Sequence, residues 1–398
     1  MIAELETARL NVEAKNRSNL FNWRGQFTPE FVDYLLENYA RPGQLVLDPF
    51  CGSGTVLQEA AARRLPALGL EINPAAYAMA KFFSFSALSP VARRRIIEQA
   101  AERLGKASAG LEPNLPLFSE ADDYREGAAN LLGLAEHMLS GTEDKHAKLL
   151  LLLSLFRAEG AKNGDLAPTM HRAFRFLADQ MLRLPATGPA PAALLADARN
   201  AHTWAEREAG LILTSPPYIN VFNYHQNHRA LLEMAGHDML KVAHSEIGSN
   251  RKHRGNRFLT VIQYCLDLEL ALKSFALALA ADGLLIMVLG RESRVRGVAF
   301  SNSDIAATLI RASGAFAEPR RYERVFMNRF GQSIVEDILI ARRAGEPVSG
   351  ERGRQIAMSF MRNALPQAVG TAREDVEDAL ARAASVLPSP LFDRSALV

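Results

Sequence analysis

A glycine-bearing turn is the first segment whose residue types could do chemistry. Residues 48–55 read DPFCGSGT and follow the apolar run QLVLD. Gly52 and Gly54 permit close backbone approach and dihedrals that other residues resist, and a helix starting after them would offer unpaired N–H groups to a ligand. Glu71 ends a second apolar run about twenty residues later. A carboxylate there can accept the ribose hydroxyls of an adenosine-containing ligand, so the two features together predict a nucleoside site.

The same turn lacks the marks of two common phosphate sites. It has no Gly-Lys-Ser/Thr triplet, which a Walker-type site requires. It also lacks the third glycine of the dinucleotide fingerprint, because Thr55, Val56 and Leu57 follow Gly54. A nicotinamide dehydrogenase is therefore disfavoured.

The second chemical segment is LILTSPPY at 211–218, in which an apolar strand should end in a rigid turn. Two consecutive prolines have no backbone N–H, so their carbonyls stay free to accept hydrogen bonds. A rigid loop would explain the prolines, but it would not explain the polar Ser215 before them or the aromatic Tyr218 after them. The segment therefore predicts a site rather than only a turn.

Alternating strands and helices must position both segments. Apolar runs are expected as strands at 44–48, 66–71, 193–197, 210–214, 283–289 and 333–342, the last paired with 320–326, and helical stretches follow the first two at 56–64 and 74–83. This order predicts an α/β fold with an open, mostly parallel sheet. The glycine turn and the SPPY turn should then meet at one edge of the sheet.

A helical block interrupts this alternation. Residues 84–191 are expected to form a helical insertion, with Ser89 as an N-cap before Pro90. Its apolar run 149–156 is too short to span a bilayer and is expected in a buried helix. The insertion divides a catalytic domain formed by 1–83 and 192–344, and residues 345–398 form a small helical extension with its helix at 372–384. Its role is open between target recognition, a lid and a dimer surface.

Composition limits the class of protein. The chain has 398 residues, 48% hydrophobic and 23% charged, with a net charge of +2, as in ordinary globular proteins. Cys51 and Cys265 are the two cysteines and lack disulfide or zinc spacing. The beginning of the chain has no signal-peptide pattern, so a cytoplasmic protein is expected. One segment, IGSNRKHRGNRF at 247–258, concentrates basic residues and is a candidate phosphate-binding surface.

DPFCGSGT, the later GLEINP at 69–74 and TSPPY at 214–218 together resemble the motifs of the DNA amino-methyltransferase family. The resemblance covers about 22–83 and 194–342. It implies a Rossmann-like sheet with helices on both faces and S-adenosylmethionine as the cofactor. It assigns cofactor binding to Phe27, Thr28, Asp48, Pro49, Phe50, Gly52, Gly54, Thr55, Glu71, Ile72, Asn73, Asp197 and Ala198.

The resemblance also implies separate roles within the cofactor set. Glu71 would hold the ribose, Ile72 would pack on the adenine and Asp197 would reach the adenine amino group. The segment 26–30 resembles the part of permuted members that touches the cofactor carboxylate. Thr28 is also a reasonable N-cap before a proline, so a structural role explains it equally well.

Catalysis is assigned by the resemblance to Ser215, Pro216, Pro217 and Tyr218. The Ser215 hydroxyl and the Pro216 carbonyl would accept the N–H bonds of an exocyclic amine, leaving its lone pair to face the methyl donor, and Tyr218 would stack on a flipped base. This chemistry needs no metal and no thiolate, unlike 5-methylcytosine formation. Serine at the first position is more typical of N4-cytosine members and aspartate of N6-adenine members. N4 of cytosine is therefore the expected target.

DNA is the expected partner of such a site-specific enzyme, and a cognate restriction endonuclease is a further candidate. The expected DNA contacts are Asn223, Arg251, Lys252, Arg254 and Arg257, with a second basic patch at Arg291, Arg294 and Arg296. His225 and His228 have metal-like spacing but no carboxylate that completes a ligand set. N6-adenine methylation, an RNA-directed enzyme and an inactive nucleic-acid-binding relative remain as alternatives.

Overall fold

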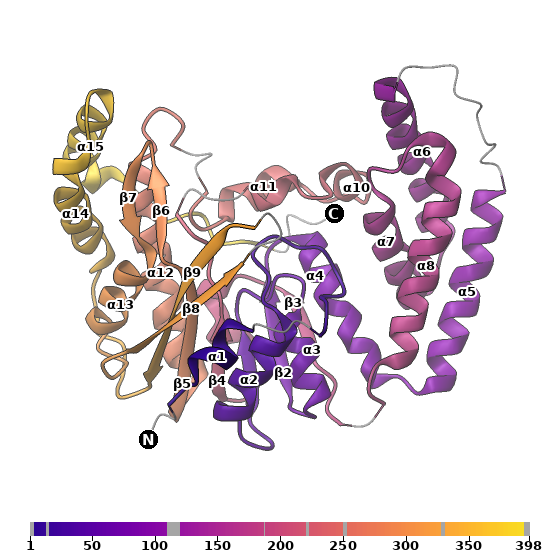
Figure 1. Ribbon diagram of the computed structural model, residues 1–398, viewed down its shortest axis with the longest axis horizontal. Coiled ribbons are helices and arrows are strands. Elements are labelled where there is room, and N and C mark those ends of the chain that lie inside the picture. Colours follow the sequence, from indigo (N-terminus) through magenta and orange to yellow (C-terminus); the bar gives the residue numbers. More distant parts are fainter. Residues whose placement is uncertain are drawn as a thin grey trace.

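The computed structural model describes residues 4–12, 16–109, 120–186, 188–219, 223–249, 253–327 and 331–393. Two expected DNA contacts, Arg251 and Lys252, lie outside these ranges. Figure 1 shows an α/β body with a separate group of helices beside it. In the described residues, no helix is both long enough and apolar enough to cross a membrane.

A seven-stranded sheet in the order β3-β2-β1-β4-β5-β9-β8 forms the centre of the body. Its strands are β1 (Leu45–Asp48), β2 (Ala67–Glu71), β3 (Ala192–Leu195), β4 (Ala209–Thr214), β5 (Leu279–Gly290), β8 (Arg320–Met327) and β9 (Ser333–Arg342). The first five are parallel, and β9 runs antiparallel to both β5 and β8. The predicted α/β class with a mostly parallel sheet is confirmed, and so is the pairing of the last two strands.

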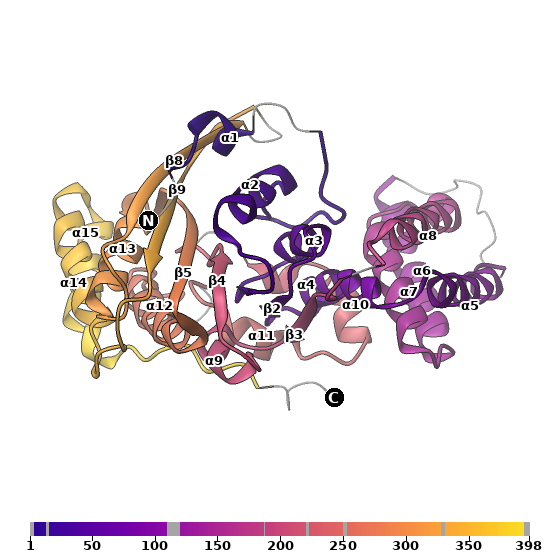
Figure 2. The same cartoon turned by 90° about the horizontal axis from the view of Figure 1, so that it is seen from below.

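Alternate residues of each strand enter different cores, because side chains along a strand point to opposite faces. Leu211 and Leu213 of β4 pack on one side, whereas Ile212 between them packs on the other. Figure 2 shows the helices on the two sides of the sheet. The first side is covered by α2 (Pro29–Tyr39), α3 (Thr55–Ala62) and α4 (Pro74–Lys81), and the second by α9 (Ala201–Trp204), α12 (Leu259–Ala278) and α13 (Asn302–Ala312).

Four helices within the predicted insertion form the separate group, namely α5 (Pro90–Ser108), α6 (Glu120–Ser140), α7 (Lys145–Ala158) and α8 (Leu166–Arg183). Ser89 caps α5 as expected, because its side chain accepts a hydrogen bond from the Ala92 N–H. The apolar run 149–156 lies in α7 and is mostly buried.

Arg93 holds the two ends of the insertion together. Its side chain is 1% exposed and donates to five backbone carbonyls, those of Phe85, Ser86, Met181, Leu184 and Pro185. Two belong to the chain entering the insertion and three to the chain leaving it. A buried guanidinium needs such acceptors, so one side chain fixes where the insertion joins the sheet.

The remaining elements lie at the ends of the chain and after the SPPY turn. They are α1 (Thr7–Asn11), α10 (Arg229–Met234), α11 (Met239–Ser245), the hairpin β6 (Glu292–Val295) and β7 (Val298–Ser301), and the tail helices α14 (Gly353–Ala364) and α15 (Thr371–Ala381). The helix expected at 372–384 corresponds to α15, whereas the hairpin and α14 were not predicted. After α15 the chain runs back under the body towards its middle (Figure 2).

Candidate active site

The glycine turn and the SPPY turn are neighbours because they follow adjacent parallel strands. Val46 and Leu47 of β1 pair with Leu211 and Ile212 of β4, so both strands end at the same edge of the sheet. The edge holds a cavity with about 890 Å³ of space, solvent at its mouth included. Gly52 and Ser215 both line it, so the structure joins the two segments in one cavity as expected.

Most of the expected cofactor residues line this cavity. They are Phe27, Asp48, Pro49, Phe50, Gly52, Thr55, Glu71, Ile72, Asn73, Asp197 and Ala198, joined from the expected catalytic set by Ser215 and Pro217. Seven expected site residues in the described part of the chain are not among its lining residues: Thr28, Gly54, Pro216, Tyr218, Asn223, Arg254 and Arg257. Arg254 lines a second cavity instead.

Glu71 links the glycine turn to the end of β2. One carboxylate oxygen accepts the Gly52 N–H at 3.0 Å, and the other accepts the Asn73 N–H at 2.8 Å. Burial raises the pKa of Glu71 to about 7, although these N–H donors lower it. The carboxylate is therefore held at the cavity wall and can accept hydrogen bonds from a ligand that displaces the chain's own donors.

Asp48 is more enclosed than Glu71, since its side chain is 2% exposed. Its Oδ1 accepts the Thr214 hydroxyl at 2.6 Å and the Phe50 N–H at 3.2 Å. Burial raises the pKa of Asp48 to about 7, and the two donors oppose that rise. Asp48 therefore fixes the start of the glycine turn relative to the end of β4.

Asp197 lines the cavity, but its oxygens already have partners. Oδ1 accepts the Arg199 N–H and Nε–H, each at 2.9 Å, and Oδ2 accepts Arg199 Nη2 at 2.6 Å and the Phe392 N–H at 2.9 Å. A carboxylate has about four acceptor positions. The contact expected between Asp197 and an adenine stays a prediction, while the present partners tie Asp197 into the protein.

Thr28 stands where an N-cap was expected, directly before Pro29 in α2, but its side chain makes no cap hydrogen bond. Its Oγ1 instead accepts Arg324 Nη2 at 3.0 Å. The expected side-chain cap is therefore wrong. The reason is competition, because the buried Arg324, 2% exposed, lies against Phe31 and needs an acceptor.

Gly54 packs inside the fold and does not line the cavity. Its φ is +89°, and a Cβ there would lie 2.8 Å from Ala80 Cα and 3.0 Å from the Phe83 ring. Only glycine combines this conformation with such a close approach. Gly54 therefore lets α4 and the chain after it pack against the glycine turn.

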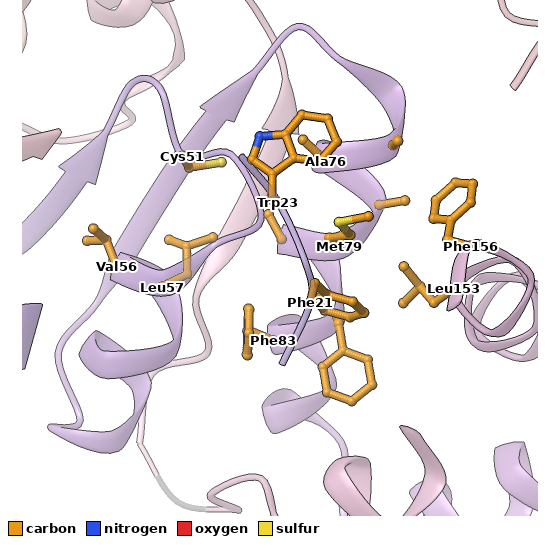
Figure 3. Close-up of a cluster of buried hydrophobic side chains, with 14 of the residues drawn as sticks. Phe21, Trp23, Cys51, Val56, Leu57, Ala76, Met79, Phe83, Leu153 and Phe156 are labelled. Carbon is orange, nitrogen blue, oxygen red and sulfur yellow. The ribbon is translucent and has the colours of Figure 1, made fainter. Parts of the chain in front are cut away.

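An aromatic pair covers the glycine turn and was not predicted. The Trp23 ring stacks on the Tyr224 ring with 5.9 Å between centroids and 17° between planes, and both residues line the cavity. Figure 3 shows Trp23 beside Cys51 of the glycine turn. Asn73 Nδ2 donates to the Tyr224 carbonyl at 3.1 Å, which holds the later segment over the earlier one. The sequence signal was the Trp-Arg-Gly triplet immediately before the 26–30 segment.

Tyr218, the last residue of the SPPY turn, does not line the cavity. Its hydroxyl is 3.5 Å from Ser215 Oγ, and a Cβ on Gly290 at the end of β5 would lie 3.0 Å from its ring. Burial raises the pKa of Tyr218, and the neighbouring Glu336 carboxylate adds to the rise. The ring is thus held in place by its surroundings, and its expected stacking on a base stays a prediction.

The two histidines after the SPPY turn pair with carboxylates from other elements. His225 Nδ1 is 2.8 Å from Glu246 Oε2, and its N–H donates to Oε1 at 2.7 Å. His228 forms a short contact with Glu159, the residue that follows α7. No cluster of potential metal ligands occurs in the described ranges. These histidines therefore connect the SPPY loop to α11 and to the insertion.

The two expected basic patches differ. Arg254 and Arg257 are exposed and have no ion pair with the described part of the chain. Arg291 binds Asp337 and Glu323, and Arg294 and Arg296 pair with Glu292 and Asp375. The second patch is thus largely neutralised within the protein.

At the level of sequence, comparison with known proteins finds similarity in the part of the chain that contains the glycine turn. A family described as DNA methylase matches residues 6–82. The type II methyltransferase M.MjaII of Methanocaldococcus jannaschii is 32% identical over 60 residues, which are 15% of this chain and 11% of that protein. The chain therefore aligns with a small part of this relative.

Solved methyltransferase structures show similarity over more of the chain at low identity. TrmN from Thermus thermophilus is 15% identical, with a TM-score of 0.33 over 81% of this chain and 50% of that one. The rRNA methyltransferase aviRa from Streptomyces viridochromogenes is 13% identical, with a TM-score of 0.34 over 85% of this chain and 94% of that one. At these TM-scores the structures say nothing about the substrate of this chain.

Proposed function

We propose that this chain is an S-adenosylmethionine-dependent methyltransferase that modifies an exocyclic amino group of a DNA base, with N4 of cytosine as its target. The observation that carries the proposal is the shared cavity, which Gly52 of the glycine turn and Ser215 of the SPPY turn both line. The match of residues 6–82 to a DNA methylase family supports the same class of reaction.

S-adenosylmethionine is the cofactor, and it supplies an electrophilic methyl group on a sulfonium sulfur. The residues present fit such a molecule. A Cβ at Gly52 would lie 3.3 Å from Trp23, so glycine at this position lets the Trp23 ring approach the turn, and both residues line the cavity. Glu71 stands at the end of β2 with two carboxylate oxygens held by backbone N–H groups, and it would hold the ribose. Ile72 lines the same wall and would pack against the adenine.

The catalytic work of the chain is to orient the amine. Ser215 Oγ has a long contact of 3.5 Å to Tyr218 Oη, so its lone pairs remain available to an amine N–H. The second N–H is proposed to go to the carbonyl of Pro216, which lies between the cavity-lining Ser215 and Pro217 without lining the cavity itself. Two such acceptors hold the nitrogen with its lone pair directed at the methyl donor, and the acceleration comes from positioning and electrostatics. This methyl transfer needs no thiolate nucleophile, so we propose no catalytic role for Cys51 or Cys265, which are both buried.

The choice of cytosine rests on Ser215, the residue type more common at this position in N4-cytosine enzymes. N6-adenine is the alternative target, and an RNA base is the next. Labelled methyl transfer to duplex DNA and to RNA, followed by nucleoside analysis, tests all three. We expect N4-methylcytosine in DNA, and N6-methyladenine or labelled RNA alone would overturn the base or the substrate.

The Ser215→Ala variant separates an enzyme from an inactive binding protein with the same fold. We expect it to lose turnover while it keeps cofactor affinity, because Ser215 lies on the amine side of the cavity. Equal turnover in the variant and the unmodified chain would contradict the proposed role.

DNA is the proposed partner, and the exposed Arg254 and Arg257 are the proposed contacts to its phosphates; a cognate restriction endonuclease stays a prediction.

A further inference from the structure

The last described segment of the chain returns from the tail helices to the back of the proposed cofactor cavity. Residues 387–393 read LPSPLFD, and we call them the C-terminal strap. Pro388 and Pro390 restrict the backbone and supply no N–H donors. Between them, Ser389 offers one N–H and one hydroxyl. The sequence therefore favours an extended segment with many free carbonyls and few donors.

Arg199 is the group that the strap meets. Its side chain is 1% exposed, and its guanidinium donates to Asp197, to Asp267 at 2.9 Å and to the carbonyls of Ser389 at 2.6 Å and Pro390 at 2.8 Å. The strap thus supplies two acceptors to a buried cation. Without them, Nη1 would lose one of its two acceptors and Nη2 would keep only the longer bond to Ser245 beside Asp197, and an unpartnered buried N–H is costly.

Asp267 of α12 receives the donors of the strap. Its Oδ1 accepts the Ser389 N–H at 2.8 Å and its Oδ2 accepts the Ser389 hydroxyl at 2.7 Å. The Asp267 side chain is fully buried, so these bonds replace water that the carboxylate has lost. A single residue between two prolines therefore binds both charges of the Arg199–Asp267 pair.

The same network reaches the cavity wall at two places. The Phe392 N–H donates to Asp197 Oδ2 at 2.9 Å, and Arg199 Nη2 donates to the Ser245 carbonyl at 3.3 Å. Asp197 and Ser245 both line the cavity. The strap is therefore joined to Asp197 directly and to Ser245 through Arg199, although it lies far along the chain from both.

We infer that the C-terminal strap is a built-in part of the cofactor site, in which Ser389 and Arg199 are positioning residues that fix the Asp197 wall. This inference rests on the proposed function for the identity of the ligand. None of the hydrogen bonds described above joins the strap to the SPPY turn or to the glycine turn. It should therefore govern how tightly the cofactor binds and not the rate of the chemical step.

The test compares the Ser389→Ala variant with the full chain, using S-adenosylhomocysteine as the probe in titration calorimetry. We expect the dissociation constant to rise about tenfold, because one buried hydrogen bond to a carboxylate is lost. The KM for S-adenosylmethionine should rise while kcat at saturation stays the same. Hydrogen exchange of the amides at 197–200 should become faster. A chain ending at Val386 should show larger changes of the same kind.

Two controls separate the strap from general destabilisation. Ser385→Ala removes the hydroxyl of an exposed serine that precedes the strap and donates to the Arg382 carbonyl, and a chain ending at Asp393 keeps the whole strap; both should bind the probe as the full chain does. Unchanged affinity and unchanged exchange in Ser389→Ala would overturn the inference. A full chain that does not bind the probe would instead overturn the proposed function, and the exchange measurement would still test the strap.

Discussion

Thr214 and Asp48, which are 166 residues apart in the chain, are joined by a 2.6 Å hydrogen bond between two buried side chains. Thr214 is the residue before Ser215, and Asp48 begins the glycine turn. Their strands are adjacent and parallel, so the bond fixes the two turns relative to each other at the edge of the sheet. Methyl transfer of the proposed kind needs such registration, because small displacements of reacting groups are costly.

Replacing Thr214 by valine should test this bond with little change in shape. Asp48 would keep the Phe50 N–H and lose its shorter partner. We expect the free energy of unfolding to fall by about 1–3 kcal/mol, the usual result when a buried polar group loses its partner. Chemical denaturation measures this. Thr308→Val is the control, since its hydroxyl only donates to the Asp304 carbonyl within α13. Equal stabilities of the two variants would contradict the assignment.

The raised pKa of Asp48 predicts a pH dependence of stability in the cofactor-free protein. Its pKa is about 7 in the folded chain and 3.8 ordinarily. At a pH between these two values, the Asp48 carboxylate therefore takes up a proton when the chain folds. The contribution of Asp48 is therefore fully present below about pH 4 and is lost as the pH rises through about 7. The loss approaches about 4 kcal/mol, at 1.36 kcal/mol for each pKa unit.

Asp48→Asn isolates this contribution, because the amide oxygen can still accept from Thr214 and does not titrate. As the pH rises from 4 to 8, the unmodified chain should lose the contribution of Asp48, whereas the variant has no such contribution to lose. The unfolding free energy of the variant should therefore increase relative to that of the unmodified chain. Denaturation at several pH values measures it. A difference that is constant with pH would show that Asp48 is ionised throughout, contrary to the effect of its burial.

The strands and the two turns could be predicted because their signals are local. The run at 210–214 is apolar and ends at a Pro-Pro pair, and β4 is buried along its whole length. The cap at Ser89 was likewise predictable from its own sequence. The hairpin β6–β7 was missed although Gly297 follows Arg296 at its turn. Both have positive φ there, but arginine at the first turn position is not the usual signal.

The polar partnerships of the site could not be predicted, because they join distant parts of the chain. Arg199 and Asp267 are separated by 68 residues, and Arg199 and Ser389 by 190. The family resemblance implied that Asp197 could reach a ligand, but it could not show that Arg199 and the strap already donate hydrogen bonds to the Asp197 oxygens. The same holds for Thr28. Its position before Pro29 could be recognised as a cap from the local sequence, but its hydrogen-bond partner Arg324 is 296 residues away.

Gly54 should tolerate alanine poorly although it does not line the cavity. A methyl group there would meet backbone at 2.8 Å, and the φ of +89° adds strain. We expect the free energy of unfolding to fall by about 1–3 kcal/mol, because the added methyl group overpacks the site and strains the backbone. Gly105→Ala is the opposite control: it lies in α5 with nothing near its Cβ position, and it should stabilise by about 0.5–1 kcal/mol. Thermal or chemical denaturation separates the two. A harmless Gly54→Ala would contradict the packing around the turn.

Arg254 and Arg257 should contribute to DNA binding through phosphates, and therefore in a salt-dependent way. Both are exposed, and neither has an ion pair with the described residues. Each phosphate contact that is lost reduces the slope of log affinity against log salt by about 0.9. We expect Arg254→Ala and Arg257→Ala to weaken binding to specific and unrelated duplexes alike, with the double variant losing about twice that slope. Arg362→Ala, an exposed arginine of the tail helix α14, should change neither quantity. If Arg254→Ala, Arg257→Ala and the double variant all bind with the same salt dependence as the unmodified chain, the DNA lies elsewhere.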